Sequence, residues 1–184
     1  GSTAMADRKD ALVAAAGFIN KVPEIVKEYG NEFTVATVGT IKVTPHSVNV
    51  IPGTCTFSLE IRDQSAEVMK LIENHLRQLL EDICKKYGVT STFVPTSYHD
   101  PAPMSELVRG TIEEAVKELG IDYTVIPSGA FHDSLIMTSV FPTGMIFVPS
   151  KDGISHSRYE YTAPEDIENG CNVLLNTVLK LDEK

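Results

Sequence analysis

The sequence has few cysteines and few basic residues, and each shortage excludes a class of protein. Its 184 residues include only three cysteines, which are widely spaced and form no Cys-x-x-Cys pair. Neither a cysteine-based zinc site nor a disulfide-stabilised secreted scaffold is expected. The 16 basic residues are outnumbered by 25 acidic ones, which gives a net charge of −9. Binding to nucleic acid or to an anionic membrane surface is therefore disfavoured.

Long apolar runs are also missing. No window approaches the roughly 18 apolar residues of a membrane span, and the N-terminus lacks the basic-then-apolar layout of a signal peptide. We therefore expect a cytoplasmic protein that has neither a membrane nor a nucleic acid among its partners. With 42% hydrophobic and 22% charged residues, the chain can still bury a core.

The first half of the chain shows helical and strand patterns in an order that indicates a known motif. Apolar residues recur at helical spacing in two segments and alternate with polar ones in others. The expected elements are a helix over 8–29, strands over 33–43 and 54–62, a helix from 68 to near Gly88 and a strand over 91–94. This order predicts a split βαβ, or ferredoxin-like, sandwich that lacks its first strand.

In the second half, helices alternate with apolar strands, and a turn-rich stretch over 97–103 separates the two halves. The expected elements are helices over 104–119, 133–139 and 165–181 and strands over 122–126 and 144–149. Nearly continuous apolar strands are typical of a buried parallel sheet. Because two strands do not make such a sheet, we interpret this half as the tail of a larger α/β domain.

Two polar loops follow the predicted strands of the second half, where α/β sheets collect ligands. The first loop, 128–134, has small residues that let backbone amides approach a ligand, and it carries His132. The second, 149–161, places His156 among acidic and hydroxyl side chains, which suits a metal ligand or a proton carrier. A lone loop histidine is usually a surface residue, but two such loops at one sheet edge favour a shared site.

Two polar residues of the first half have both an ordinary and a functional interpretation. The alternation over 54–62 places Arg62 on the wetter face beside Glu60, either as a surface ion pair or as a fork for a substrate carboxylate. Asn49 is by default a turn former. The remaining histidines, which we expect at the surface, are His46, His75 and His99.

Three segments resemble the hydantoinase/carbamoylase-type amidases. They are the predicted hairpin 37–63, the loop 128–134 and the block 143–162. That family includes N-carbamoyl-L-amino-acid hydrolases and allantoate amidohydrolases, and it lies within the dinuclear-metal peptidase superfamily. Residues 1–16 are similar to the family stretch that follows a His-Ala pair. The chain thus resembles the C-terminal part of a longer enzyme.

The resemblance implies two domains and a set of site residues. Residues 1–98 correspond to an incomplete lid or dimerisation domain, and 99–184 to the C-terminal portion of a zinc-peptidase-like α/β catalytic domain. No catalytic residue is expected here, because the general base and the other metal ligands lie upstream in the family. Phe131 stands where the family usually has glycine, so the width of the pocket wall is open. The residues carried over are His156 as a metal ligand and Asn49, Arg62, Gly129, Ala130 and His132 as substrate-binding residues.

The resemblance also implies the chemistry. Two divalent ions, zinc or manganese with cobalt or nickel as alternatives, would hold a hydroxide that attacks a carbamoyl or ureido carbon. Arg62 would bind the substrate's carboxylate. The isolated chain is expected to be inactive. Two alternatives stay open, namely an aminoacylase or dipeptidase of the same superfamily and a non-catalytic dimerisation module.

A length argument bears on the partner. A strand from Thr54 to Arg62 rises roughly 26 Å, at about 3.3 Å per residue, and Asn49 precedes its start. One small substrate does not easily reach both Asn49 and Arg62. Either the strand bends strongly or a second subunit supplies one of the two residues, so we expect a homodimer formed through the lid.

Overall fold

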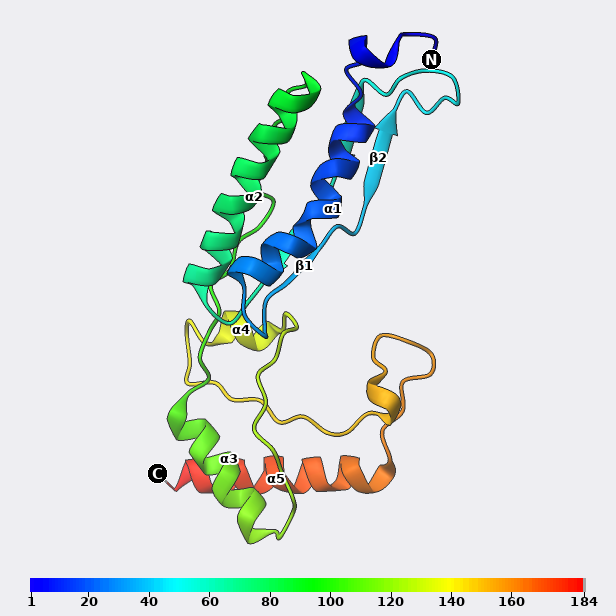
Figure 1. Cartoon of the computed structure of the whole chain (residues 1–184). Helices are drawn as coiled ribbons and strands as arrows, with labels where there is room; N and C mark the ends of the chain where they lie inside the picture. Colours follow the sequence, from blue (N-terminus) through cyan, green and yellow to red (C-terminus); the bar gives the residue numbers. More distant parts are fainter. Residues whose placement is uncertain (184) are drawn as a thin grey trace. The chain divides into compact units, whose positions relative to one another are not determined.

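The chain forms two compact units. A computed structural model describes residues 1–183, and these divide into a first unit, Gly1–Pro101, and a second that begins at Ala102. A short 3-10 helix, Met5–Asp7, precedes the main elements of the first unit (Figure 1). None of the helices within 1–183 is both long and apolar enough to cross a membrane.

Two long helices dominate the first unit. Helix α1 (Ala11–Tyr29) begins after Asp10, whose carboxylate accepts two first-turn N–H groups at 3.0 and 3.1 Å. Helix α2 (Ala66–Tyr87) ends at Gly88, whose φ of 63° lies in the left-handed region that glycine adopts without steric cost. Both helices were predicted, although α1 begins three residues later than the pattern indicated.

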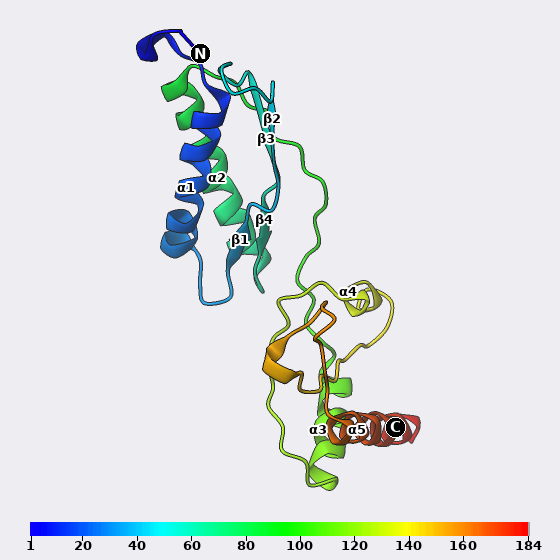
Figure 2. The same ribbon diagram turned by 90° about the vertical axis from the view of Figure 1, so that its right-hand side faces the viewer.

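The strands of the first unit form two antiparallel pairs, and α1 and α2 cover one face of them (Figure 2). Strand β1 (Val35–Thr37) pairs with β4 (Glu60–Arg62), and β2 (Ile41–Thr44) pairs with β3 (Thr54–Phe57). Each predicted strand is therefore divided in two. At the break between β3 and β4, the Ser58 hydroxyl accepts the backbone N–H of Thr40 at 3.0 Å. A side-chain oxygen thus accepts the N–H that a backbone carbonyl of the neighbouring strand would accept in a continuous sheet.

The core of the first unit lies between its helices and strands. Ile72 and Leu76 of α2 are almost completely buried, at 0% and 1% exposure. The alternation predicted for 54–62 is confirmed, because Phe57, Leu59 and Ile61 pack against this core whereas Thr56, Ser58 and Glu60 are exposed. The buried core residues are Ala14, Phe18, Val22, Ile72, Leu76 and Ile83.

The predicted closing strand over 91–94 is wrong, since this segment is extended but has no strand assignment. A strand requires a neighbouring backbone, and the described residues supply none to it. Phe93 is held instead by Arg77, whose guanidinium carbon lies 3.6 Å from the ring centroid. The unit is thus a mixture of helices and small sheets, and the ferredoxin-like lid remains a prediction.

In the second unit, α3 (Glu106–Glu118) packs across α5 (Pro164–Asp182) (Figure 1). A short helix, α4 (Asp133–Met137), and a 3-10 turn, Lys151–Gly153, lie in the intervening loops. All three helices agree with the predicted ones to within a few residues. The residues buried between α3 and α5 are Thr111, Ala115, Val116, Val173 and Thr177.

The two strands predicted for the second unit, 122–126 and 144–149, are absent from the described structure. Both segments are extended, yet neither has a paired strand beside it, and Val125 is 67% exposed. The second segment passes close to α5. A Cβ placed on Gly170 would lie 2.5 Å from Cγ1 of Val148, so glycine permits this approach.

Candidate functional site

The loop that contains His132 is closed by its own side chains. Nε2 of His132 lies 2.9 Å from the Ser128 hydroxyl, which also accepts the backbone N–H of Ala130 at 3.3 Å. The His132 ring meets Phe147 edge-on, with the ring centroids 5.6 Å apart and the planes at 63°. The imidazole is half-buried and has a defined orientation.

The other predicted residues of this loop are open to solvent. Gly129 and Ala130 are exposed, and a Cβ added to Gly129 would meet no atom within 4 Å. Phe131, which stands where the amidases that the sequence resembles usually have glycine, is 52% exposed. The effect of Phe131 on a pocket therefore remains a prediction.

His156 is presented from the long loop between the 3-10 turn and α5. Its φ of 55° is left-handed, which is uncommon for a residue with a side chain. The Glu160 carboxylate accepts the backbone N–H of His156 at 2.9 Å and thereby stabilises this conformation. The loop is closed at its base, where the Lys151 N–H donates to the Tyr161 carbonyl at 2.8 Å.

The described residues do not by themselves fit a metal centre. Within 1–183, no three His, Cys, Asp or Glu side chains come close enough to hold an ion. Glu160, an acid of the same loop, accepts the backbone N–H of His156. A single imidazole does not fix a divalent ion, since zinc sites use three or four protein ligands.

Arg62 lies at the end of β4, on the face opposite Ile61. Its Nη2 donates to Glu60 Oε1 at 2.9 Å, and the side chains of Arg62 and Glu60 are 41% and 59% exposed. The structure thus contains the ordinary ion pair that the sequence suggested. An exposed pair of this kind contributes about 0–1 kcal/mol.

Asn49 occupies an exposed turn between β2 and β3. The Ser47 hydroxyl donates to its Oδ1 at 3.1 Å, and the Gly53 N–H closes the turn on the Thr44 carbonyl at 3.0 Å. The residue next to this turn is Gly1, on which a Cβ would lie 2.5 Å from the Asn49 carbonyl oxygen. Asn49 and Arg62 thus belong to the first unit, whereas His132 and His156 belong to the second.

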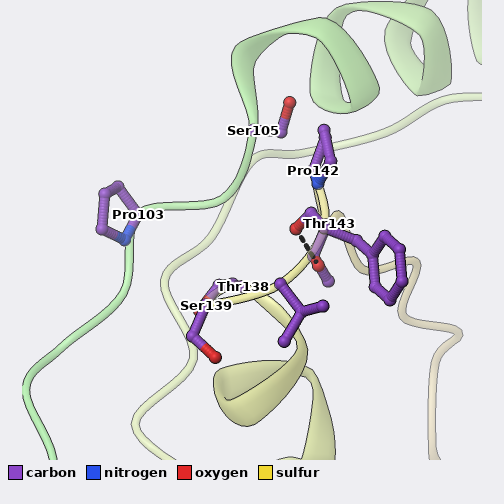
Figure 3. Close-up of a pocket in the computed structure, with 8 residues that line it drawn as sticks. Pro103, Ser105, Thr138, Ser139, Pro142 and Thr143 are labelled. Carbon is purple, nitrogen blue, oxygen red and sulfur yellow. Dashed lines mark hydrogen bonds between the residues drawn. The ribbon is translucent and has the colours of Figure 1, made fainter.

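A hollow of about 380 Å³ lies in the second unit but coincides with none of the predicted residues. Its hydroxyl groups already have partners, as Figure 3 shows for Thr143, which donates to the Phe141 carbonyl at 2.9 Å. Ser139 similarly donates to Ile136 at 2.7 Å. The four lining hydroxyls, those of Ser105, Thr138, Ser139 and Thr143, therefore each have a partner within this unit. Its lining residues are Pro103, Ser105, Thr138, Ser139, Val140, Phe141, Pro142 and Thr143.

The three histidines outside the two predicted loops are all at least partly exposed. His46 and His99 are exposed. His75 is partly exposed, and its ring stacks on Tyr29 with the ring centroids 3.6 Å apart. The stack joins α1 to α2, a contact between residues far apart in sequence that single-chain patterns do not reveal.

Sequence reasoning singled out the loop 128–134 but missed the bond between Ser128 and His132. The available signal was a serine four residues before a histidine, with glycine, alanine and phenylalanine between them, of which the two small residues help the chain to turn back on itself. It also missed the bond between Glu160 and the His156 backbone. Nothing in the sequence indicates a left-handed conformation at His156.

Comparison with known proteins assigns the family. The sequence model of peptidase family M20/M25/M40 matches residues 1–180, and the chain belongs to this family. It is 39% identical over 181 residues to an N-carbamoyl-L-amino acid amidohydrolase from Geobacillus stearothermophilus, and 33% identical over 181 residues to an allantoate amidohydrolase from Bacillus subtilis. Each match covers 98% of this chain and 44% of the relative, so the chain spans less than half the length of these relatives.

The structural comparison agrees. A crystal structure of a hydantoinase/carbamoylase family amidase from Burkholderia multivorans matches 98% of this chain with a TM-score of 0.86 at 36% identity, again over 44% of that protein. The resemblance stated from the sequence is thus confirmed. The mixture of helices and small sheets is consistent with the α/β fold of this family.

Proposed function

We propose that this chain is part of an amidohydrolase that cleaves the C–N bond of carbamoyl or ureido substrates, such as an N-carbamoyl-L-amino acid or allantoate. The amidohydrolase names of the relatives support this proposal. Residues 1–98 act as the lid and dimerisation domain, and 99–184 form the C-terminal portion of the catalytic domain. The term full-length enzyme is used below for a polypeptide that also supplies the part of the relatives that this chain does not cover.

The observation that carries the proposal is the way Arg62 holds a carboxylate. Its guanidinium is partly exposed on the outer face of β4 and already binds the Glu60 carboxylate at 2.9 Å. Planar guanidinium groups match carboxylates with two parallel hydrogen bonds, a geometry that an ammonium group does not reproduce. Arg62 therefore exchanges Glu60 for the substrate's carboxylate and selects acidic over neutral substrates.

The remaining site residues have supporting roles. Asn49 contributes an amide to the substrate from its turn, and the loop of Gly129, Ala130 and His132 lines the substrate pocket. Asn49 and Arg62 are separated along the chain by β3 and the break at Ser58. A homodimer formed through the first unit supplies one of these two residues to each site.

The metal chemistry of the family requires residues outside this chain. The described residues do not fit a metal centre, and we assign to them only His156 as one imidazole ligand in the full-length enzyme. The isolated chain is accordingly expected to be inactive. Its two polar loops then contribute to a site that the rest of the enzyme completes.

The test is the substitution of Arg62 by lysine in the full-length enzyme. Lysine keeps the charge but loses the two-point geometry, so kcat/KM on the acidic substrate should fall about tenfold or more, as expected for a lost charge-assisted bond of about 1.5–3 kcal/mol. Arg77→Lys is the matched control, because Arg77 forms a similar ion pair with Glu73 at 2.6 Å in the same unit. It should leave kcat/KM unchanged.

Comparing an acidic with a neutral substrate shows whether Arg62 binds the substrate's carboxylate or only forms a surface ion pair. A neutral amide analogue lacks the carboxylate, so it should be a poor substrate for the unaltered enzyme and scarcely worse for Arg62→Lys. Equal losses on both substrates would return Arg62 to the role of a surface ion pair. Release of an amino acid from N-acyl substrates, without ammonia from N-carbamoyl ones, would instead identify an aminoacylase or dipeptidase.

A further inference from the structure

The hydroxyl of Ser128 has two partners that differ in chemical character. It accepts the N–H of Ala130 at 3.3 Å and lies 2.9 Å from Nε2 of His132. A serine hydroxyl offers one proton and two lone pairs. The Ala130 N–H is always a donor and occupies a lone pair, which leaves the hydroxyl proton available for Nε2.

A hydroxyl that donates to Nε2 determines where the imidazole carries its own proton. In a neutral histidine one ring nitrogen is a donor and the other an acceptor, and the hydrogen bond at one nitrogen sets the state of the other. If Nε2 of His132 accepts from Ser128, then Nδ1 carries the proton. No described residue forms a hydrogen bond with Nδ1 of His132, so its N–H is available to donate to a ligand.

The orientation of the ring is fixed from two further sides. The edge-on contact with Phe147 limits its rotation. The backbone of His132 is fixed as well, because its carbonyl accepts the N–H of Leu135 at 2.9 Å at the start of α4. The side chain forms no cap for this helix, since it is turned back toward Ser128. Ring and backbone are therefore both held before any ligand arrives.

We infer that Ser128 is a positioning residue, which orients His132 through Nε2 so that Nδ1–H donates to an oxygen atom of the bound substrate. The inference rests on the proposed function for the nature of the substrate, whose carbamoyl and carboxylate oxygens are hydrogen-bond acceptors. It assigns to Ser128 a role in fixing the tautomer of His132, in addition to closing the loop.

The first experiment reads the tautomer without turnover. Nitrogen NMR of the 184-residue chain labelled with 15N-histidine gives the protonation state of each ring nitrogen at a pH where His132 is neutral. His132 is assigned by its loss in His132→Gln. We expect Nδ1–H in the unaltered chain and in Ser128→Thr, which keeps the hydroxyl. Ser128→Ala should shift His132 toward Nε2–H, the tautomer that a free imidazole side chain prefers.

The second experiment is a double-mutant cycle on kcat/KM in the full-length enzyme. Ser128→Ala should lower kcat/KM about three- to tenfold, the effect of one hydrogen bond, and should have no further effect in a His132→Ala background. Ser128→Thr should retain most of the activity. Ser139→Ala is the control, because this hydroxyl bonds only to the Ile136 carbonyl of its own turn.

The outcomes separate the inference from the proposed function. Nε2–H in the unaltered chain, or a tautomer unchanged by Ser128→Ala, overturns the inference whatever the enzyme hydrolyses. Equal losses from Ser128→Ala with and without His132 overturn it as well, since they show a purely structural role. If His132 in the isolated chain shows the averaged tautomers of an unstructured histidine, the double-mutant cycle on kcat/KM decides whether the inference holds. Absence of turnover on carbamoyl substrates alongside the expected tautomers contradicts only the proposed function.

Discussion

The two units differ in what covers their apolar segments. In the first unit, Phe57, Leu59 and Ile61 pack against a core formed by α1 and α2, and Phe57 and Ile61 lie in paired strands. In the second unit, Val125 and Ile126 are 67% and 57% exposed although their segment is equally apolar. Apolar composition alone therefore does not predict burial, because burial also requires a neighbouring segment.

Helix α5 shows the same contrast on a single element. One face is buried against α3 through Val173 and Thr177. A second face is apolar and exposed, and it recurs at helical spacing. Large exposed apolar surfaces are unusual on a soluble monomer and mark an interface. This face agrees with the proposal that the second unit is the C-terminal portion of a larger catalytic domain, the rest of which would cover it. Its residues are Ile167, Leu174, Leu175, Val178 and Leu179.

The largest expected effect compares a buried leucine with an exposed one. Leu76→Ala removes a fully buried side chain and should lower the free energy of unfolding of the first unit by about 2–5 kcal/mol. Leu175→Ala, the same chemical change on the exposed face of α5, should alter the stability of the chain by no more than about 0.5 kcal/mol. Urea unfolding followed by circular dichroism measures both. Similar losses in the two variants would show that α5 is covered in the chain as it stands.

A smaller effect is expected in the reactivity of two cysteines. Cys171 is exposed on α5, whereas Cys55 is half-buried in β3, and burial raises the pKa of the Cys55 thiol. Because the thiolate is the reactive form, Cys171 should be alkylated much faster than Cys55 at neutral pH in the 184-residue chain. Mass spectrometry of timed samples measures both rates. In the full-length enzyme, Cys171 should become protected and Cys55 should change little; an equally reactive Cys171 there would contradict the covered face.

Local signals predicted the helices well and the strands only in part. The ends of the helices follow from residues such as Asp10 and Gly88, which act on the backbone beside them. The segments 91–94, 122–126 and 144–149 have strand-like composition, yet a strand depends on a partner elsewhere in the chain. The described residues contain no partner for them, so the prediction failed where it relied on another segment.

In the candidate site too, the features that follow from a periodic pattern were predicted and those that depend on loop conformation were not. The outward position of Arg62 follows from the alternation of β4, and its ion pair with Glu60 was one of the two interpretations that the sequence offered. The bond between Ser128 and His132 and the left-handed φ of His156 depend on how each loop folds back on itself. Loop conformations of this kind have no periodic sequence pattern, so they were missed.

The smallest expected effect concerns the segment 122–126. Tyr123 donates to the Glu113 carboxylate on α3, and Lys117 pairs with the same carboxylate at 2.8 Å. Lys117, followed by Tyr123, lowers the pKa of Glu113 below its ordinary value of 4.5. The stabilisation is therefore fully present above the unfolded-state pKa and is lost as pH falls through the lower folded-state pKa.

Glu113→Gln should thus lower the Tm of the second unit slightly at pH 7, and the difference from the unaltered chain should disappear below that folded-state pKa. Calorimetry at a series of pH values measures this difference. The control is Glu24→Gln, which removes an exposed pair with Lys21 in the first unit. A Tm difference for Glu113→Gln that stays constant from neutral to acid pH would exclude the charge as its cause.

The most direct test of the account measures ammonia release from an N-carbamoyl-L-amino acid, with and without the rest of the enzyme. When it is supplied with zinc or manganese, the 184-residue chain should release no more ammonia than the metal alone. After dialysis, it should retain well below one ion per chain. The full-length enzyme should release ammonia, and His156→Ala should abolish that release. Turnover by the chain alone above the metal blank, or unchanged turnover in His156→Ala, would contradict the account.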